Sequence, residues 1–312
     1  MSASAGKVVI AALVGNLLIA LTKFGAALAT GSSAMLSEGV HSLVDTGNQA
    51  LMLLGMKRAQ RPASAGFPFG HGKEIYFWSF MVALLLFGLG AGVSIWEGVW
   101  HLQHPAEMTR PAVAYAVLLA SLVFEGVSFS IALKEFNKVR NGLGYLEAAR
   151  RGKNPVFFVV LFEDSAAMLG LLAALAGVTL THLTGSPIWD GLASIVIGLV
   201  LAATAIWLAR ETMGLLIGEG ADKTVVEAIR SCAIAHPQIE NINEIATLHM
   251  GPDFVVVNMS LDFSNQLKIG ELESLVTRLT REIKAVDSSI KRVFIEAESR
   301  EDHAHSTPAL AD

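Results

Sequence analysis

Six apolar segments, each close to the length of a membrane span, dominate the chain up to about residue 210. A transmembrane helix needs about 20 largely apolar residues. The segments are bounded by polar, glycine or proline residues, and they lie at 8–30, 33–56, 75–99, 111–133, 155–180 and 188–209. Only 16% of the residues are charged, against about 25% in soluble domains. The sequence therefore predicts an α-helical membrane protein with six transmembrane helices.

The loops between these segments carry charge unevenly. Basic residues gather in the second and fourth loops, at Lys57, Arg58, Arg61, Lys73, Lys134, Lys138, Arg140, Arg150, Arg151 and Lys153. Because basic loops stay in the cytoplasm, these loops, and with six spans both termini, are predicted to be cytoplasmic. The opening MSASAGK is too short for a secretory signal. We expect an integral multi-pass protein of a bacterial inner (plasma) membrane.

The second apolar segment contains two ionisable residues, His41 and Asp45. They are four residues apart and therefore share one face of a helix. An ionisable group at membrane depth costs at least ~2.5 kcal/mol, so two on one face need a joint reason. Neutral imidazole and carboxylate are good ligands for first-row metals, which favours a metal site. The alternative is a buried His–Asp hydrogen bond that fixes helix packing.

A third buried carboxylate, Asp164, lies in the fifth segment, and Glu163 precedes it. Adjacent residues are about 100° apart around a helix, so Glu163 does not share the face of Asp164. Glu163 is therefore an additional candidate ligand, through a bent geometry or a water molecule, or a hydrogen-bond partner or proton relay.

Two further membrane segments carry single charges. Lys23 in the first segment is expected to pair with a buried acid or to extend to the membrane surface. Glu125 in the fourth segment shares a face with Ser121 and Ser128, which is compatible with hydrogen bonding or with proton relay.

The second loop ends in the stretch FPFGHGKE, at residues 67–74. Gly70 and Gly72 permit a tight loop that holds His71 and Lys73 near the membrane surface. His71 is a lesser candidate for binding a passing metal ion, and a role in loop structure or gating is the preferred alternative.

After residue 210 the pattern becomes that of a soluble domain. Helical periodicity covers 221–235 and 269–286, and strand patterns cover 239–248, 254–263 and 293–297. The predicted domains are 1–210 in the membrane, an α+β domain at 211–300, and a disordered tail at 301–312.

Three motifs together resemble the cation diffusion facilitator family, the proton-coupled zinc transporters. They are HSLVD at 41–45, the Asp164-Ser165 to Gly170 stretch, and FPFGHGK at 67–73. The chain departs from the usual family pattern because Val160 stands where a fourth ligand is expected. The Glu163-Asp164 pair is similar to that of the zinc transporter 9-like subgroup.

The resemblance implies proton-coupled efflux of a divalent transition metal from the cytoplasm, with zinc first and manganese, iron or cobalt as alternatives. It implies His41, Asp45 and Asp164 as ligands, with Glu163 or water in the fourth place. It also implies a ferredoxin- or metallochaperone-like cytoplasmic domain that dimerises. The partners are then the metal ion, protons, membrane lipid and a second copy of the chain, and no cofactor is expected.

Two other functional classes compete with transport. An intramembrane metal hydrolase would use the same three ligands and a metal-bound water, but the chain has neither an HExxH nor a GxSxG motif. A metal sensor that does not transport is the other class. The net charge of −5 argues against a basic nucleic-acid-binding surface.

Overall fold

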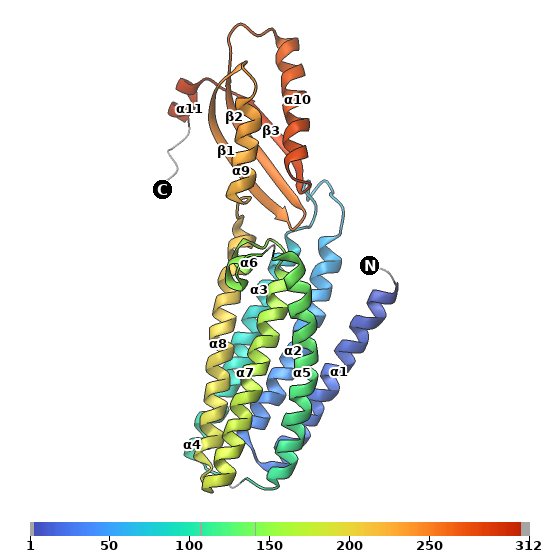
Figure 1. Cartoon of the computed structure of the whole chain (residues 1–312), viewed down its shortest axis with the longest axis vertical. Helices are drawn as coiled ribbons and strands as arrows, with labels where there is room; N and C mark the ends of the chain where they lie inside the picture. The colour runs from blue at the N-terminus through green and yellow to red at the C-terminus, as the bar shows by residue number, and fades with distance from the viewer. Residues whose placement is uncertain (1–2, 107, 141, 307–312) are drawn as a thin grey trace. The chain divides into compact units, whose positions relative to one another are not determined.

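The computed structural model describes residues 3–106, 108–140 and 142–306, and Figure 1 shows the chain as a ribbon. Its contacts divide the chain into two compact units. The membrane unit comprises the residues up to Lys57 together with Ile75–Met213. The second unit comprises Arg58–Glu74 and the residues from Gly214 onward. The loop that carries His71 therefore groups with the C-terminal part of the chain.

Helices occupy all six apolar segments of the membrane unit. They are α1 (Ala3–Thr30), α2 (Ser33–Ala59), the continuous helix Glu74–Gln103, α5 (Pro111–Val139), α7 (Pro155–Thr184) and α8 (Ile188–Ile217). Among the described residues, all of these except α1 and α2 are long and apolar enough to cross a membrane, and α1 contributes the shorter apolar stretch Asn16–Thr30. The prediction of a helical membrane domain is confirmed, whereas length and composition support four of the six predicted spans.

The third of these helices is interrupted by a wider turn. A π-helical segment, η1 (Leu86–Ala91), joins α3 (Glu74–Leu85) to α4 (Gly92–Gln103). Such segments take up an extra residue within a helix. Beyond it, a Cβ added at Gly98 would lie 2.7 Å from the backbone oxygen of Gly191 in α8. Glycine at this position lets α4 and α8 pack closely, as small residues do between membrane helices.

Local sequence signals set the beginning of α7. The charged residues near the end of α8 do not terminate that helix. The Asn154 side chain accepts a hydrogen bond from the Val156 backbone N–H, and Pro155 takes the first helical position. Past the predicted end at 209, α8 continues to Ile217. Its Glu211 is 3.7 Å from the Arg150 side chain, which lies in the short helix α6 (Tyr145–Arg151). A charged residue with a partner is compatible with a continuing helix.

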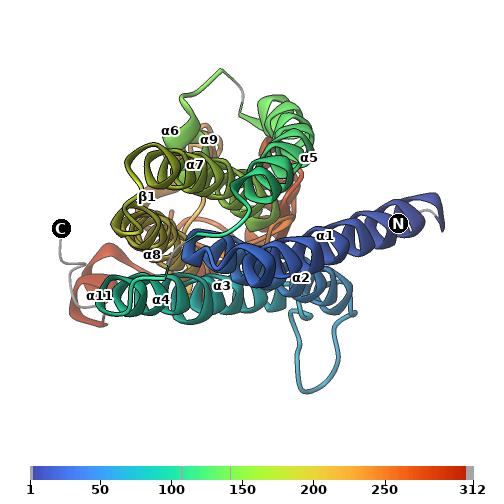
Figure 2. The same ribbon diagram turned by 90° about the horizontal axis from the view of Figure 1, so that it is seen from below.

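Within the membrane unit α2 contacts several other helices. Its Gly55 lies against Trp78 of α3, where an added Cβ would be 2.8 Å from the Trp78 Cβ. Side chains of α2 also bond to α1, α7 and α8, in contacts described below. The end-on view shows α1 beside α2 and α7 beside α8 (Figure 2). The helix that carries His41 and Asp45 thus contacts helices on several sides.

The second unit has the predicted order helix, strand, strand, helix, strand. Its elements are α9 (Lys223–Ile234), β1 (Ile239–Gly251), β2 (Phe254–Phe263), α10 (Ile269–Val286) and β3 (Ile290–Ala297). The sheet order is β1-β2-β3, with β1 antiparallel and β3 parallel to β2. Alternate residues of β2, from Val255 to Leu261, pack with Ile229 of α9 and Leu279 of α10 in one hydrophobic core. The period-2 pattern that predicted β2 is therefore the face that the two helices cover.

Two features of the second unit differ from or add to the sequence predictions. Phe69 of the loop contacts Phe254 and Phe294 edge to face, with ring centroids 6.4 and 6.5 Å away. Residues Arg300–Ser306 form the short helix α11, although 301–312 were predicted to be disordered. The reason is a local cap, because the Ser299 hydroxyl accepts from the Asp302 backbone N–H and donates to the Asp302 carboxylate. Residues 307–312 lie outside the described residues.

Candidate metal-transport site

The structure brings His41 and Asp45 together. The imidazole Nε2 lies 3.4 Å from the Asp45 Oδ2, and the His41 side chain is buried. Beyond that ion pair, neither His41 nitrogen nor the Asp45 Oδ1 has a hydrogen-bond partner in the part of the chain that the structure describes. Leaving one buried polar atom without a partner costs about 1–3 kcal/mol. Buried polar atoms without partners are rare in folded proteins, so each of these atoms needs an explanation, such as a bound ion.

Asp164 and Glu163 of α7 lie near Asp45. The Ser128 hydroxyl of α5 donates to Asp164 Oδ2 over 3.0 Å. The Asn48 side-chain amide of α2 donates to Glu163 Oε1 over 2.7 Å. Both carboxylates are buried and close enough to interact electrostatically with Asp45. Helices α2, α5 and α7 therefore enclose one acidic region.

The side chains of His41, Asp45, Asp164 and Glu163 lie in one region but are not arranged around a single point. Among the described residues, no three His, Cys, Asp or Glu side chains meet closely enough to hold one ion. His41 and Asp45 adjoin, whereas Asp164 and Glu163 are held by hydrogen bonds from neighbouring helices. The predicted ligand set of His41, Asp45 and Asp164, with Glu163 as an addition, stays a prediction.

Lys23 has the buried acid that the sequence led us to expect. Its Nζ lies 2.9 Å from Glu38 Oε2 and donates to the Ser42 hydroxyl over 2.8 Å. A Cβ added at Gly170 would lie 2.6 Å from the other Glu38 oxygen. Glycine at Gly170 thus leaves room on α7 for the Glu38 carboxylate.

Sequence reasoning missed Glu38 and Asn48, although a signal for each was present. Glu38 lies four residues before Ser42 on the helix face that meets Lys23, and a buried lysine requires an acid. Asn48 lies seven residues after His41, which returns it to the same helix face. Glu125 of α5 is buried and interacts electrostatically with Lys23 and Glu38, and its predicted relay role stays a prediction.

His71 belongs to the second unit rather than to the membrane unit. Its ring lies against Phe67 with centroids 4.4 Å apart. Its Nδ1 is buried and has no hydrogen-bond partner among the described residues. The contact with Phe67 agrees with the structural role preferred for this loop, and metal binding by His71 stays a prediction.

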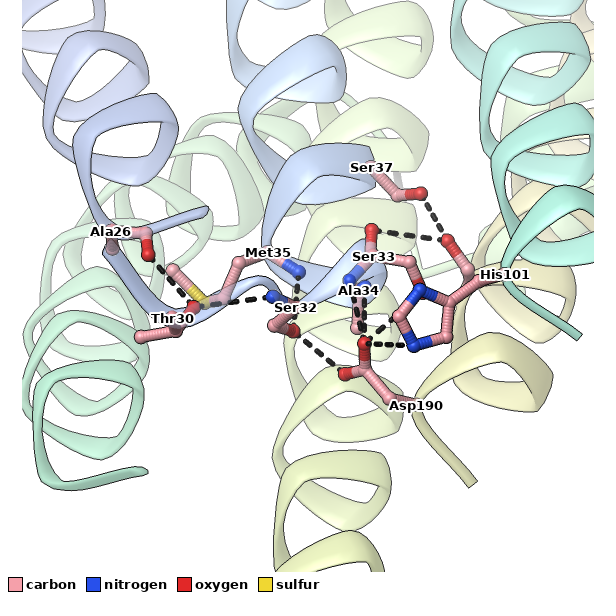
Figure 3. A network of polar contacts seen from close by, with 10 residues as sticks. Ala26, Thr30, Ser32, Ser33, Ala34, Met35, Ser37, His101 and Asp190 are labelled. Carbon is pink, nitrogen blue, oxygen red and sulfur yellow. Dashed lines mark hydrogen bonds and ion pairs between the residues drawn. The ribbon is translucent and has the colours of Figure 1, made fainter. Parts of the chain in front are cut away.

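A second buried network fixes the beginning of α2 (Figure 3). The Asp190 carboxylate of α8 accepts hydrogen bonds from the Ser32 hydroxyl, at 2.6 Å, and from the Ser33 backbone N–H, at 2.5 Å. The His101 ring of α4 lies 3.8 Å from the same carboxylate. A carboxylate at a helix N-terminus satisfies free N–H groups and interacts favourably with the helix dipole. Asp190 thus caps α2 from another helix, about two turns before His41.

The structure is thus a helical membrane protein with a buried histidine and several buried carboxylates among its helices. A family model described as the cation efflux transmembrane domain matches residues 9–217. The chain therefore belongs to the cation efflux family, the cation diffusion facilitators, as its motifs indicated.

Individual relatives add detail to this assignment. The chain is 34% identical to "Proton-coupled zinc antiporter SLC30A9, mitochondrial" of Xenopus laevis, over 84% of this chain and 47% of that protein. It is 31% identical to the protein of the same name in Homo sapiens, over 84% of this chain and 46% of that protein. It is 22% identical to "Manganese efflux system protein MneP" of Bacillus subtilis, over 93% of this chain and 94% of that protein.

These relatives confirm the resemblance to the zinc transporter 9-like subgroup. The chain spans about half the length of the curated zinc antiporters that it matches. The relatives are transporters, and the chain is assigned as a multi-pass membrane protein rather than an enzyme.

Proposed function

We propose that this protein exports a divalent transition-metal cation, zinc in the first place, across a membrane in exchange for protons. The observation that carries the proposal is the pair of His41, which is buried, and Asp45, which is 14% exposed. Both His41 nitrogens and the Asp45 Oδ1 are buried and lack hydrogen-bond partners among the described residues. The buried carboxylates of Glu163 and Asp164 face the same region. A cation supplies what these atoms lack.

His41, Asp45 and Asp164 are the proposed ligands, and Glu163 is an additional one. Imidazole nitrogen and carboxylate oxygen suit zinc, and a site with one histidine and several oxygens also suits manganese, iron or cobalt. The names of the relatives that the chain resembles include both a zinc antiporter and a manganese efflux protein.

Proton exchange follows from the chemistry of the ligands. A metal binds the deprotonated forms of histidine and carboxylate, so binding releases protons and acid weakens binding. A site open to the cytoplasm loads the cation and loses protons, and a site open to the other side takes up protons and releases the cation. Rocking of helices around a site near the middle of the membrane supports such alternating access.

The proposed architecture has six membrane spans with both termini in the cytoplasm, in a bacterial inner membrane. Basic loops before α3 and after α5 support this orientation. The second unit, with its mixed sheet and two covering helices, is the proposed cytoplasmic domain and supports a homodimer. The mass of the full chain in detergent tests the dimer.

Metal flux into sealed proteoliposomes tests the function. The full chain is reconstituted with an imposed pH gradient, and Zn²⁺, Mn²⁺, Fe²⁺ and Co²⁺ are compared. We expect uptake that requires the gradient and carries protons in the opposite direction. Flux equal to that of protein-free vesicles for every cation would exclude the proposed function.

A further inference from the structure

Asn48 is the one buried amide side chain of α2 that faces the candidate site. The residue is fully buried. Its Nδ2 donates to Glu163 Oε1 over 2.7 Å. Its Oδ1 is also buried and has no hydrogen-bond partner among the described residues. Half of this side chain therefore has a structural partner, and the other half, a good acceptor, has none.

The position of Asn48 on the helix places it in line with His41 and Asp45. His41, Asp45 and Asn48 are spaced four and then three residues apart, so they follow one another along one face of α2. Each of them presents a buried nitrogen or oxygen atom without a hydrogen-bond partner in the described chain. Buried polar atoms without partners are rare in folded proteins, and each needs an explanation. A cation bound beside this face is one explanation, because imidazole nitrogen, carboxylate oxygen and amide oxygen can each donate an electron pair to a metal.

Val160 lies one helical turn before Asp164 on α7 and offers only methyl groups. His41, Asp45 and Asp164 leave a tetrahedral site one ligand short, and Glu163, whose Oε1 accepts a hydrogen bond from Asn48, is the other candidate for that place. Asn48 approaches the same region from α2, beside Glu163.

We propose that the side-chain carbonyl of Asn48 is a further ligand of the transported cation, and that its amide group positions Glu163. This inference rests on the proposed function, because it concerns the same site. It makes Asn48 a residue that determines both affinity and cation preference.

The choice of an amide rather than a further acid has an electrostatic reason. Asp45 already interacts with the carboxylates of Glu163, Glu125 and Asp164. Like charges in a region of low dielectric repel strongly, so another carboxylate would oppose ionisation of the others. An amide oxygen coordinates a cation and adds no charge. Carbonyl oxygen favours harder cations such as manganese, whereas imidazole favours zinc.

Binding of Zn²⁺ and Mn²⁺ to the purified full chain, measured by calorimetry at fixed pH, tests the inference. Asn48→Leu keeps the size of the side chain and removes both polar atoms. We expect its Kd to rise at least about tenfold, the lower end of what loss of a supporting partner costs a metal site. We expect the loss to be larger for Mn²⁺ than for Zn²⁺. Thr46→Val, a buried substitution on the same helix, is the matched control and should bind as the wild type does.

A merely positional role predicts a different pattern. If Asn48 acted only by holding Glu163, then Asn48→Leu would add nothing in a Glu163→Ala background. If Asn48 is a ligand, Asn48→Leu weakens cation binding in the Glu163→Ala background as well.

Cobalt gives a readout that does not depend on transport. The visible absorption of bound Co²⁺ reports its coordination, so Asn48→Leu should change the spectrum and Thr46→Val should not. Suppose that the wild-type protein binds and transports cations, and that Asn48→Leu has the same Kd values and the same Co²⁺ spectrum. That result overturns this inference and leaves the proposed function intact. A wild-type protein that neither binds nor carries any cation overturns the proposed function, and the inference with it.

Discussion

Replacement of Lys23 by methionine removes the positive charge of a completely buried ion pair. The lysine Nζ lies 2.9 Å from Glu38 Oε2, and both side chains have 0% exposure. Methionine is similar in length, so the main change is electrostatic. The Glu38 carboxylate would stay in the interior without its cation, with its Oε1 already lacking a hydrogen-bond partner among the described residues.

The expected loss of stability is about 3–5 kcal/mol, the cost of removing one partner of a buried ion pair. That loss lowers the ratio of folded to unfolded protein roughly 100- to 4,000-fold. All five tryptophans lie in the membrane unit, so tryptophan fluorescence during denaturation in detergent reports on that unit. The midpoint for Lys23→Met should therefore fall well below that of the wild type.

A double variant separates the charge effect from loss of packing. Replacing a buried ion pair by uncharged side chains is often neutral or stabilising. Lys23→Met combined with Glu38→Gln should therefore recover most of the stability that Lys23→Met loses. A wild-type midpoint for Lys23→Met, or a double variant whose loss equals the sum of the two single losses, would refute the reasoning.

Three further predictions concern the same helices. Asp45→Ala removes one of three proposed ligands, so proteoliposome flux should fall to the background level while tryptophan fluorescence shows an unchanged fold. Val160→His adds an imidazole one helical turn before Asp164, so competition between Zn²⁺ and Mn²⁺ flux should shift toward Zn²⁺. Gly170→Ala places a Cβ 2.6 Å from Glu38 Oε1, and because Lys23 holds that carboxylate, denaturation should show a loss of about 1–3 kcal/mol.

Each of these predictions has an outcome that contradicts it. Near wild-type flux in Asp45→Ala would mean that the transport site lies elsewhere. An unchanged cation preference in Val160→His would mean that residue 160 does not face the cation. Wild-type stability in Gly170→Ala would mean that the Glu38 carboxylate moves without cost.

The helices were predictable because each follows from a local pattern. Apolar length predicted all six helices of the membrane unit, and alternation of apolar residues predicted β2 with its observed ends. One error is at the end of an element that has a distant partner. The predicted last span stopped before Arg210, whereas α8 continues to Ile217, and its Glu211 has a partner on α6.

The candidate site was predictable to the same extent. The proximity of His41 and Asp45 is a property of one helix and follows from their spacing. The partners of Asp164 and Glu163 lie on α5 and α2, and no spacing within α7 indicates them. Asp190 of α8 caps α2 from more than 150 residues away, so its role depends on tertiary packing alone.

The grouping of Arg58–Glu74 with the C-terminal residues has a mechanical consequence. The chain passes between the two units three times, after Lys57, before Ile75 and after Met213. Force from a movement of the second unit is therefore transmitted to the ends of α2 and α3 as well as to α8. Because α2 carries His41, an event in the second unit has a direct covalent route to the candidate site. Cutting the chain after Met213 would remove only one of the three connections and would leave Phe69 without its two aromatic partners.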